Sequence, residues 1–202
     1  MAGILSNLRN TVITGFVVTL VLFIVIRALL GTGFSLDGNW FQFLFRWLHV
    51  LSGVMWIGLL WYFNFVQIPN MPNIPDEQKP AIGKVIAPAA LWWFRWGAMA
   101  TIATGLILAW LNDYLLEALL IGLTDGGVST PIGLGMWMGA IMWFNVWFVI
   151  WPNQKKALGM VEVGADEKAA AARTAMLFSR TNTLLSIPML YCMVAAQNGG
   201  FA

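Results

Sequence analysis

The sequence predicts an all-α integral membrane protein, a bundle of five transmembrane helices that forms a single membrane domain over residues 1–202. Hydrophobic residues make up 59% of the chain and charged residues only 10%. The mean hydropathy of +0.75 lies outside the range of soluble globular domains. Five stretches are apolar over the about 20 residues that a helix needs to cross about 30 Å of hydrocarbon. A chain of this length leaves no room for a separate soluble domain.

The predicted spans are residues 11–30, 41–67, 89–111, 132–151 and 175–196. The first span is longer than the apolar core of a secretory signal and no small-x-small cleavage site follows it, so we interpret it as uncleaved. The second span is longer than the bilayer requires, which predicts that it tilts or projects beyond the hydrocarbon. Residues 166–173 combine strong helix formers with acids first and arginine last, so the fifth helix is expected to begin in the cytoplasm.

The connections between the spans differ in character. Residues 68–88 contain five prolines, which predicts an extended loop. Residues 114–123 are apolar with one glutamate, which predicts a short interfacial helix capped by Asn112 and Asp113. Gly135 and Gly139 form a GxxxG pattern on the fourth span, which predicts close helix packing there.

The distribution of basic residues predicts the orientation. The basic loop residues all fall in the N-terminal segment and the two even-numbered connections, namely Arg9, Lys79, Lys84, Lys155, Lys156, Lys168 and Arg173. The opposite loops carry aspartates and a glutamate but no lysine. We therefore expect a cytoplasmic N-terminus and a periplasmic C-terminus in a bacterial inner membrane, with lipid as a partner. The small net charge of +2, spread over the loops, argues against nucleic acid as a partner.

Cysteine and carboxylate usage excludes several classes of site. Cys192 is the only cysteine, so the chain has no disulfide framework, no CxxC pair and no CxxCH site for covalent haem attachment. All nine carboxylates lie outside the predicted spans. The absence of a membrane carboxylate argues against an ion-coupled pump or a cation channel.

A first group of candidate residues lies toward the outer side of the membrane: Arg27, Arg46, His49, Met189 and Met193. His49 is the only histidine, and a thioether at a similar depth on the fifth span would complete a b-type haem site. The two arginines would then pair with the haem propionates. The alternative is that the histidine hydrogen-bonds to a neighbouring helix while the arginines reach the lipid headgroups.

A second group lies toward the inner side and consists of amide and guanidinium side chains. Its members are Asn64, Gln67, Arg95, Asn145, Arg180 and Asn182. Buried arginines without acidic partners need other acceptors, and an anionic or urea-like ligand would supply them. The alternative is that these side chains form polar contacts between helices and anchor the protein at the interface.

Four segments resemble the N-terminal membrane domain of the bacterial membrane-bound, cytochrome-linked urate oxidase family. They read RWLHVLSGVMWIGLLWYFNFVQIP, LWWFRWGAMATIATGLIL, MWFNVWFVIWPNQKKALG and ARTAMLFSRTNTLLSIPMLYCMVAA. The resemblance covers about residues 44–196 and implies a short relative that lacks the cytochrome c domain. It implies oxidation of a small heterocycle, with electrons passed to a cytochrome c in trans. His49 would match the family's early histidine, and the family's polar motif positions would match Asn64, Arg95, Asn145, Arg180 and Asn182.

The leading functional hypothesis is an inner-membrane subunit of an electron-transfer or oxidase system that binds one haem b through His49 and is related to urate oxidation. One alternative is a non-catalytic accessory subunit of a larger respiratory or photosynthetic complex, with other membrane subunits as partners and no cofactor of its own. Another alternative is a small-solute carrier or channel that uses the inner arginines.

Overall fold

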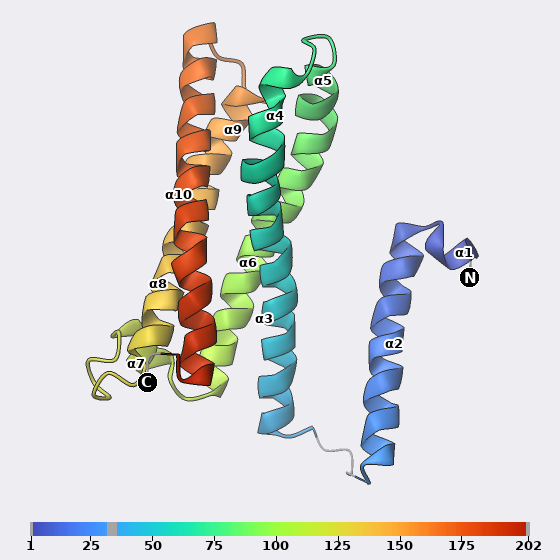
Figure 1. Cartoon of the computed structure of the whole chain (residues 1–202), viewed down its shortest axis with the longest axis vertical. Coiled ribbons are helices and arrows are strands. Elements are labelled where there is room, and N and C mark those ends of the chain that lie inside the picture. The colour runs from blue at the N-terminus through green and yellow to red at the C-terminus, as the bar shows by residue number, and fades with distance from the viewer. Residues whose placement is uncertain (1, 32–35, 201–202) are drawn as a thin grey trace. The chain divides into compact units, whose positions relative to one another are not determined.

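The computed structural model describes residues 2–31 and 36–200, and every regular element in these ranges is a helix (Figure 1). The chain divides into two compact units, residues 1–40 and 41–202. In the first unit, α1 (Ala2–Leu5) is followed by α2 (Leu8–Leu29). The Asn7 side chain caps α2 by accepting a hydrogen bond from the Asn10 amide at 3.2 Å. No residue of α2 is buried within the first unit.

Among the described residues, four continuous helices are long and apolar enough to cross a membrane: Leu8–Leu29, Gly38–Asn73, Lys79–Leu111 and Thr130–Ala157. They contain the first four predicted spans, except residue 30 at the end of the first, and confirm them as membrane-length helices. At 36 residues, the second of these helices extends about 54 Å, which is longer than the about 30 Å of hydrocarbon that it would cross. The predicted fifth span lies within α10 (Ala165–Asn198), which begins where the sequence indicated.

Three of the long continuous helices in the second unit, here called rods, each join two α-helical parts through a π-helical segment. The first joins α3 (Gly38–Trp61) through η1 (Tyr62–Gln67) to α4 (Ile68–Asn70) and the 3₁₀ turn η2 (Met71–Asn73). The second joins α5 (Lys79–Ala81) through η3 (Ile82–Ile86) to α6 (Ala87–Leu111). The third joins α8 (Thr130–Phe144) through η4 (Asn145–Ile150) to α9 (Trp151–Ala157).

Each π-helical segment ends two residues before a proline, at Pro69, Pro88 and Pro152. A proline has no N–H, and its ring clashes with the carbonyl four residues earlier, which lies inside the π-helical segment in each case. The wider π turn moves that carbonyl away, so the helix continues through the proline.

The predicted proline-rich loop over residues 68–88 is wrong for most of its length, because helix continues to Asn73 and resumes at Lys79. Pro72 and Pro80 occupy the first turn of a helical segment, where the missing N–H costs nothing. The short helix α7 (Leu115–Leu119) confirms that the predicted segment contains a helix, but its predicted cap is wrong. Asn112 instead donates to the Leu108 carbonyl at 2.7 Å and so ends α6.

The core of the second unit lies where α3, α6, α8 and α10 run side by side (Figure 1). Its most deeply buried large side chains include Trp56, Leu60, Phe94 and Met142. Four α-helices are therefore held together by aromatic and aliphatic packing, with α4, α5 and α9 at one end of the bundle and α7 at the other.

Candidate functional site

Two asparagines of the inner group form a buried hydrogen-bond network between α10 and the α8–η4 rod. Asn145 Nδ2 donates to Asn182 Oδ1 at 2.8 Å, and Asn182 Nδ2 donates to the Met142 carbonyl at 2.9 Å. Asn145 is the first residue of η4, and Asn182 is completely buried. The two amides therefore join the rods to one another.

Asn64 makes the corresponding contact between η1 and α10. Its Nδ2 donates to the Leu60 carbonyl at 2.9 Å and to Ser179 Oγ at 2.7 Å. The three asparagines thus make the interhelical polar contacts that the sequence analysis left open as the alternative to a ligand site.

Arg95 is the charged residue that the bundle buries most deeply within the described ranges, at 8% exposure. Its Cζ lies 3.4 Å from the centroid of the Trp151 ring and 6.0 Å from that of Trp147. Its Nη1 has no hydrogen-bond partner among the described residues. Arg180 of the same predicted group is exposed instead, so the structure does not bring the two arginines together in the core.

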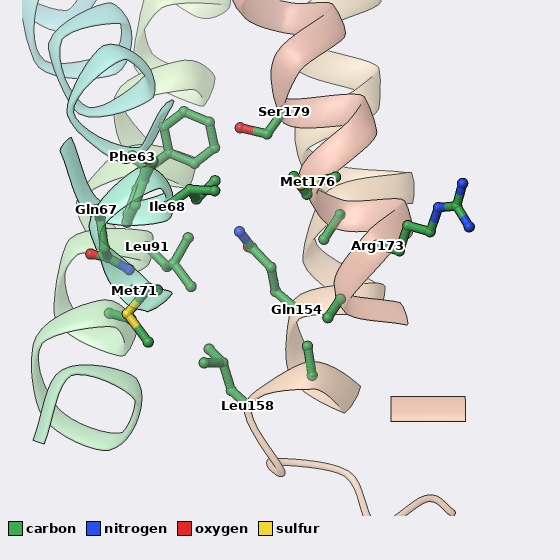
Figure 2. A pocket seen from close by; sticks show the side chains of 15 residues that line it. Phe63, Gln67, Ile68, Met71, Leu91, Gln154, Leu158, Arg173, Met176 and Ser179 are labelled. Carbon is green, nitrogen blue, oxygen red and sulfur yellow. The ribbon is translucent and has the colours of Figure 1, made fainter. Parts of the chain in front are cut away.

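A pocket of about 490 Å³ opens at the end of the bundle that carries α4, α5 and α9. Its wall is mostly apolar and includes Phe63, Leu91 and Phe94. Ser179 also lines it, so the Asn64 hydrogen bond ends at the pocket wall. Gln67 and Gln154 supply amide groups from two different rods (Figure 2).

Gln154 and Ser179 are site residues that sequence reasoning missed. The predicted fourth span ended at residue 151, whereas the helix continues to Ala157 because η4 accommodates Pro152. A polar residue placed two positions after that proline was the available signal.

His49 lies on α3, half-buried against α6. Its Nδ1 is 2.9 Å from the Thr101 carbonyl oxygen, which can only accept, so Nδ1 carries the proton. In the neutral ring this leaves Nε2 as the unprotonated nitrogen. A Cβ on Gly105 would lie 2.8 Å from His49 Cε1, so this glycine makes room for the ring.

The other residues of the predicted haem group have separate surroundings. Met189 belongs to the core cluster, and Met193 Sδ lies 3.4 Å from the position of a Cβ on Gly135 of α8. His49 instead contacts α6 at the Thr101 carbonyl and Gly105. Among the contacts of the described residues, none joins either methionine to the imidazole.

The two outer arginines lie in different units. Arg27 belongs to the first unit, where its guanidinium lies 5.9 Å from the centroid of the Phe23 ring. Arg46 is exposed on α3 near Tyr114, beyond the end of α6. Burial raises the pKa of the Tyr114 phenol, and the charge of Arg46 opposes that rise. Within the described ranges, no group of three histidine, cysteine or carboxylate side chains could hold a metal ion.

The bundle, with its membrane-length rods, buried amides and an end-on pocket, has the architecture of a polytopic helical membrane protein. Residues 126–199, from the turn before α8 to the end of α10, match the family model for the urate oxidase N-terminal domain. This match confirms the urate oxidase N-terminal-like part of the predicted resemblance. No curated protein and no solved structure matches the chain.

Proposed function

We propose that this protein is an inner-membrane subunit of an electron-transfer or oxidase system related to urate oxidation, and that it binds one haem b through His49. The observation that carries the haem proposal is the hydrogen bond from Nδ1 to the Thr101 carbonyl. Histidines that ligate metals usually donate their other ring nitrogen to a carbonyl or carboxylate, which fixes the ring and frees the ligating nitrogen. A haem bound there would supply one-electron redox chemistry.

The donor set supports a single protein ligand to such a haem. His49 fits this role, whereas Met189 and Met193 are held in helix packing on other surfaces. Arg46 is exposed on the same helix as His49 and remains our proposed propionate partner. Arg27 is proposed as a second propionate partner only from its position in the sequence.

The haem proposal is tested by a reduced-minus-oxidised spectrum and a pyridine haemochrome assay on the protein in mild detergent. We expect about one b-type haem per chain and its loss in His49→Ala. Because the chain has one histidine, ¹⁵N-histidine labelling gives a single imidazole whose tautomer can be read directly. A colourless, folded protein, or haem retained in His49→Ala, would refute the proposal.

The proposed topology has five spans, with α10 as the fifth, a cytoplasmic N-terminus and a periplasmic C-terminus. Support for α10 comes from its 34 residues and its packing along α8 and α9. Its polar groups at Asn182 and Ser186 are completely buried, so they do not face lipid. Cysteine labelling from either side of the membrane at positions 128 and 162 tests this topology.

The inner group supports an anionic heterocycle as the substrate of the proposed system. Arg95 is a buried cation without a carboxylate partner, and the flat faces of Trp147 and Trp151 lie beside it. Asn64, Asn145 and Asn182 would then hold the rods around the ligand. We expect urate binding to weaken at least tenfold in Arg95→Gln, with the exposed Arg180→Gln as the matched comparison. Equal affinity in both variants would remove Arg95 from the substrate site.

One observation favours a second candidate, a non-catalytic accessory subunit of a larger membrane complex. The α2 helix belongs to a compact unit of its own and reaches a mean hydropathy of 2.6 over an 18-residue window of its 22 residues, which suits contact with lipid or with another subunit. A colourless protein that co-purifies with larger membrane subunits, and loses them when α2 is replaced by a polyleucine helix, would support this candidate over the haem protein.

A further inference from the structure

The pocket at the α4–α9 end of the bundle contains hydrogen-bonding groups that the protein itself does not use. The side-chain oxygens of Gln67 and Gln154 are buried, and neither has a hydrogen-bond partner among the described residues. A buried acceptor without a partner costs about 1–3 kcal/mol. Rotation of either terminal amide exchanges its oxygen and nitrogen, so a ligand in the pocket that donates to the turned oxygen would offset that cost.

The pocket also offers donors. Each glutamine amide carries N–H groups, and Ser179 Oγ, which accepts from Asn64, has its own proton to donate. The Gln154 side chain extends into the space between the rods (Figure 2). Amides and hydroxyls thus present both donors and acceptors to one ligand.

No charged group faces this ligand among the described lining residues. Arg173 is the charged residue of the wall, and its guanidinium points away from the pocket (Figure 2). Arg95 is engaged with Trp151 and does not line the pocket. Transfer of a charged ligand into such an apolar site would be costly, so the lining selects a neutral one.

We infer that this pocket binds the head group of a neutral quinone and its quinol. A quinone presents carbonyl oxygens that accept hydrogen bonds, and its quinol presents hydroxyls that donate them. Amide and hydroxyl partners serve both forms, whereas a purely donating or purely accepting site would favour one. The apolar wall of Phe63, Leu91, Phe94 and Leu158 suits the ring and the start of an isoprenoid tail.

This inference rests on the proposed electron-transfer function for its choice of a redox-active ligand. Two electrons and two protons convert a quinone to its quinol, and the quinol returns them on oxidation. The proposed heterocycle oxidation is a source of two electrons, and a membrane quinone accepts two electrons, so in this inference the quinone takes the place of the cytochrome c that the resemblance implies as acceptor. The pocket lies at the end of the bundle that the proposed topology places toward the cytoplasm, where protons are available.

Decylubiquinone is the probe, titrated by calorimetry into the full-length protein in nanodiscs of saturated phosphatidylcholine. We expect saturable binding of one molecule per chain. Gln67→Leu and Gln154→Leu should each weaken it about tenfold, because each removes a hydrogen bond without enlarging the pocket. Gln197→Leu makes the same chemical change at an exposed position of α10 and should bind as the unchanged protein does. Since the two pocket glutamines lie on different rods, a folding defect in one variant leaves the other to decide.

Three results would overturn the inference: equal affinity in all three variants, displacement of the quinone by decanol at similar concentration, or displacement by urate. Decanol would indicate a site for lipid chains, and urate would indicate an anion site. The outcome for the haem proposal can be distinguished from the outcome for the quinone site. Loss of the haem signal with quinone binding intact would leave the pocket assigned, whereas bound haem without quinone binding would refute this inference alone.

Discussion

Arg95 and Trp151 are stacked, with Arg95 Cζ 3.4 Å from the centroid of the Trp151 ring. Within the described residues the ion pairs are Lys79–Asp76 and Lys156–Glu167, and neither involves Arg95. The face of an aromatic ring is therefore what stabilises this buried cation where a carboxylate would usually do so. The contact also joins α6 to α9 beside the pocket.

We expect a double-mutant cycle of Arg95→Met and Trp151→Leu to give a coupling energy of about 1–2 kcal/mol, because the cation and the ring are both shielded from water. Unfolding by sodium dodecyl sulphate in mixed micelles measures it. Arg180→Met combined with Trp151→Leu is the matched cycle, and its coupling should be near zero because Arg180 is exposed. Equal coupling in the two cycles would contradict the stacking.

Replacement of Asn182 by alanine should destabilise the bundle by about 1–3 kcal/mol, because it leaves Asn145 Nδ2 buried without an acceptor. Asn198→Ala is the control on the same helix. Asn198 is exposed and bonds only to the Val194 carbonyl one turn earlier, so its loss should change stability by less than about 0.5 kcal/mol. An equal loss of stability in Asn182→Ala and Asn198→Ala would contradict this prediction.

The predicted close packing holds at Gly135, which lies against Cys192 and Met193 of α10, but not at Gly139, and the tightest contact on α8 is at Gly133. A Cβ on Gly133 would lie 2.4 Å from the Ala118 carbonyl oxygen, whereas one on Gly139 would meet no atom within 4 Å. Gly133→Ala should therefore cost about 1–3 kcal/mol, since backbone cannot move aside as a side chain can. Gly139→Ala should be neutral or slightly stabilising in thermal unfolding. If Gly139→Ala were less stable than Gly133→Ala, the close contact of Gly133 with the Ala118 carbonyl would be excluded.

The sequence predicted the helical class and the first four spans because apolar length is a local property. It did not predict where those helices end. Pro69, Pro88 and Pro152 looked like helix breakers, but each follows a π-helical segment that absorbs the proline. Such a segment is stabilised by packing between rods, which no window of sequence contains.

The candidate site was predictable to a similar degree. The sequence singles out a lone histidine and a set of membrane amides, and the structure buries three of those amides, Asn64, Asn145 and Asn182. Whether an amide bonds to a neighbour or to a ligand depends on its helix face and depth. Gln154 lies one turn beyond the predicted span, and for that reason it escaped notice.

The Asp125 carboxylate organises the loop before α8, and its role should disappear in acid. Hydrogen bonds from the Ser129 side chain and from the Ser129 and Gly127 amides lower the pKa of Asp125. The carboxylate's contribution is therefore complete above its unfolded pKa of about 3.9 and is lost as pH falls through the lower folded value. Hydrogen exchange of the two amides, corrected for intrinsic rates, should accelerate in that acidic range. In Asp125→Ala the same two amides should exchange fast at every pH. A corrected exchange rate that does not change with pH in the protein with Asp125 would contradict this prediction.

The final prediction concerns the fit of His49 against Gly105. A Cβ at position 105 would lie 2.8 Å from Cε1 and 3.1 Å from Nδ1 of the ring, so Gly105→Ala must displace the imidazole and weaken its bond to the Thr101 carbonyl. With ¹⁵N-histidine, the Nδ1 proton signal should shift and exchange faster. Gly58→Ala on α3 is the matched change, since a Cβ there meets nothing within 4 Å.

Bound haem should follow the histidine in these variants. If Nε2 ligates the iron, Gly105→Ala lowers the haem per chain while Gly58→Ala keeps it, because only the first moves the ligand. If the ¹⁵N signal shifts in Gly105→Ala but haem content stays the same, the ring has moved without consequence for the cofactor. The haem would then have another ligand, and the hydrogen bond to Thr101 would be a packing contact between α3 and α6.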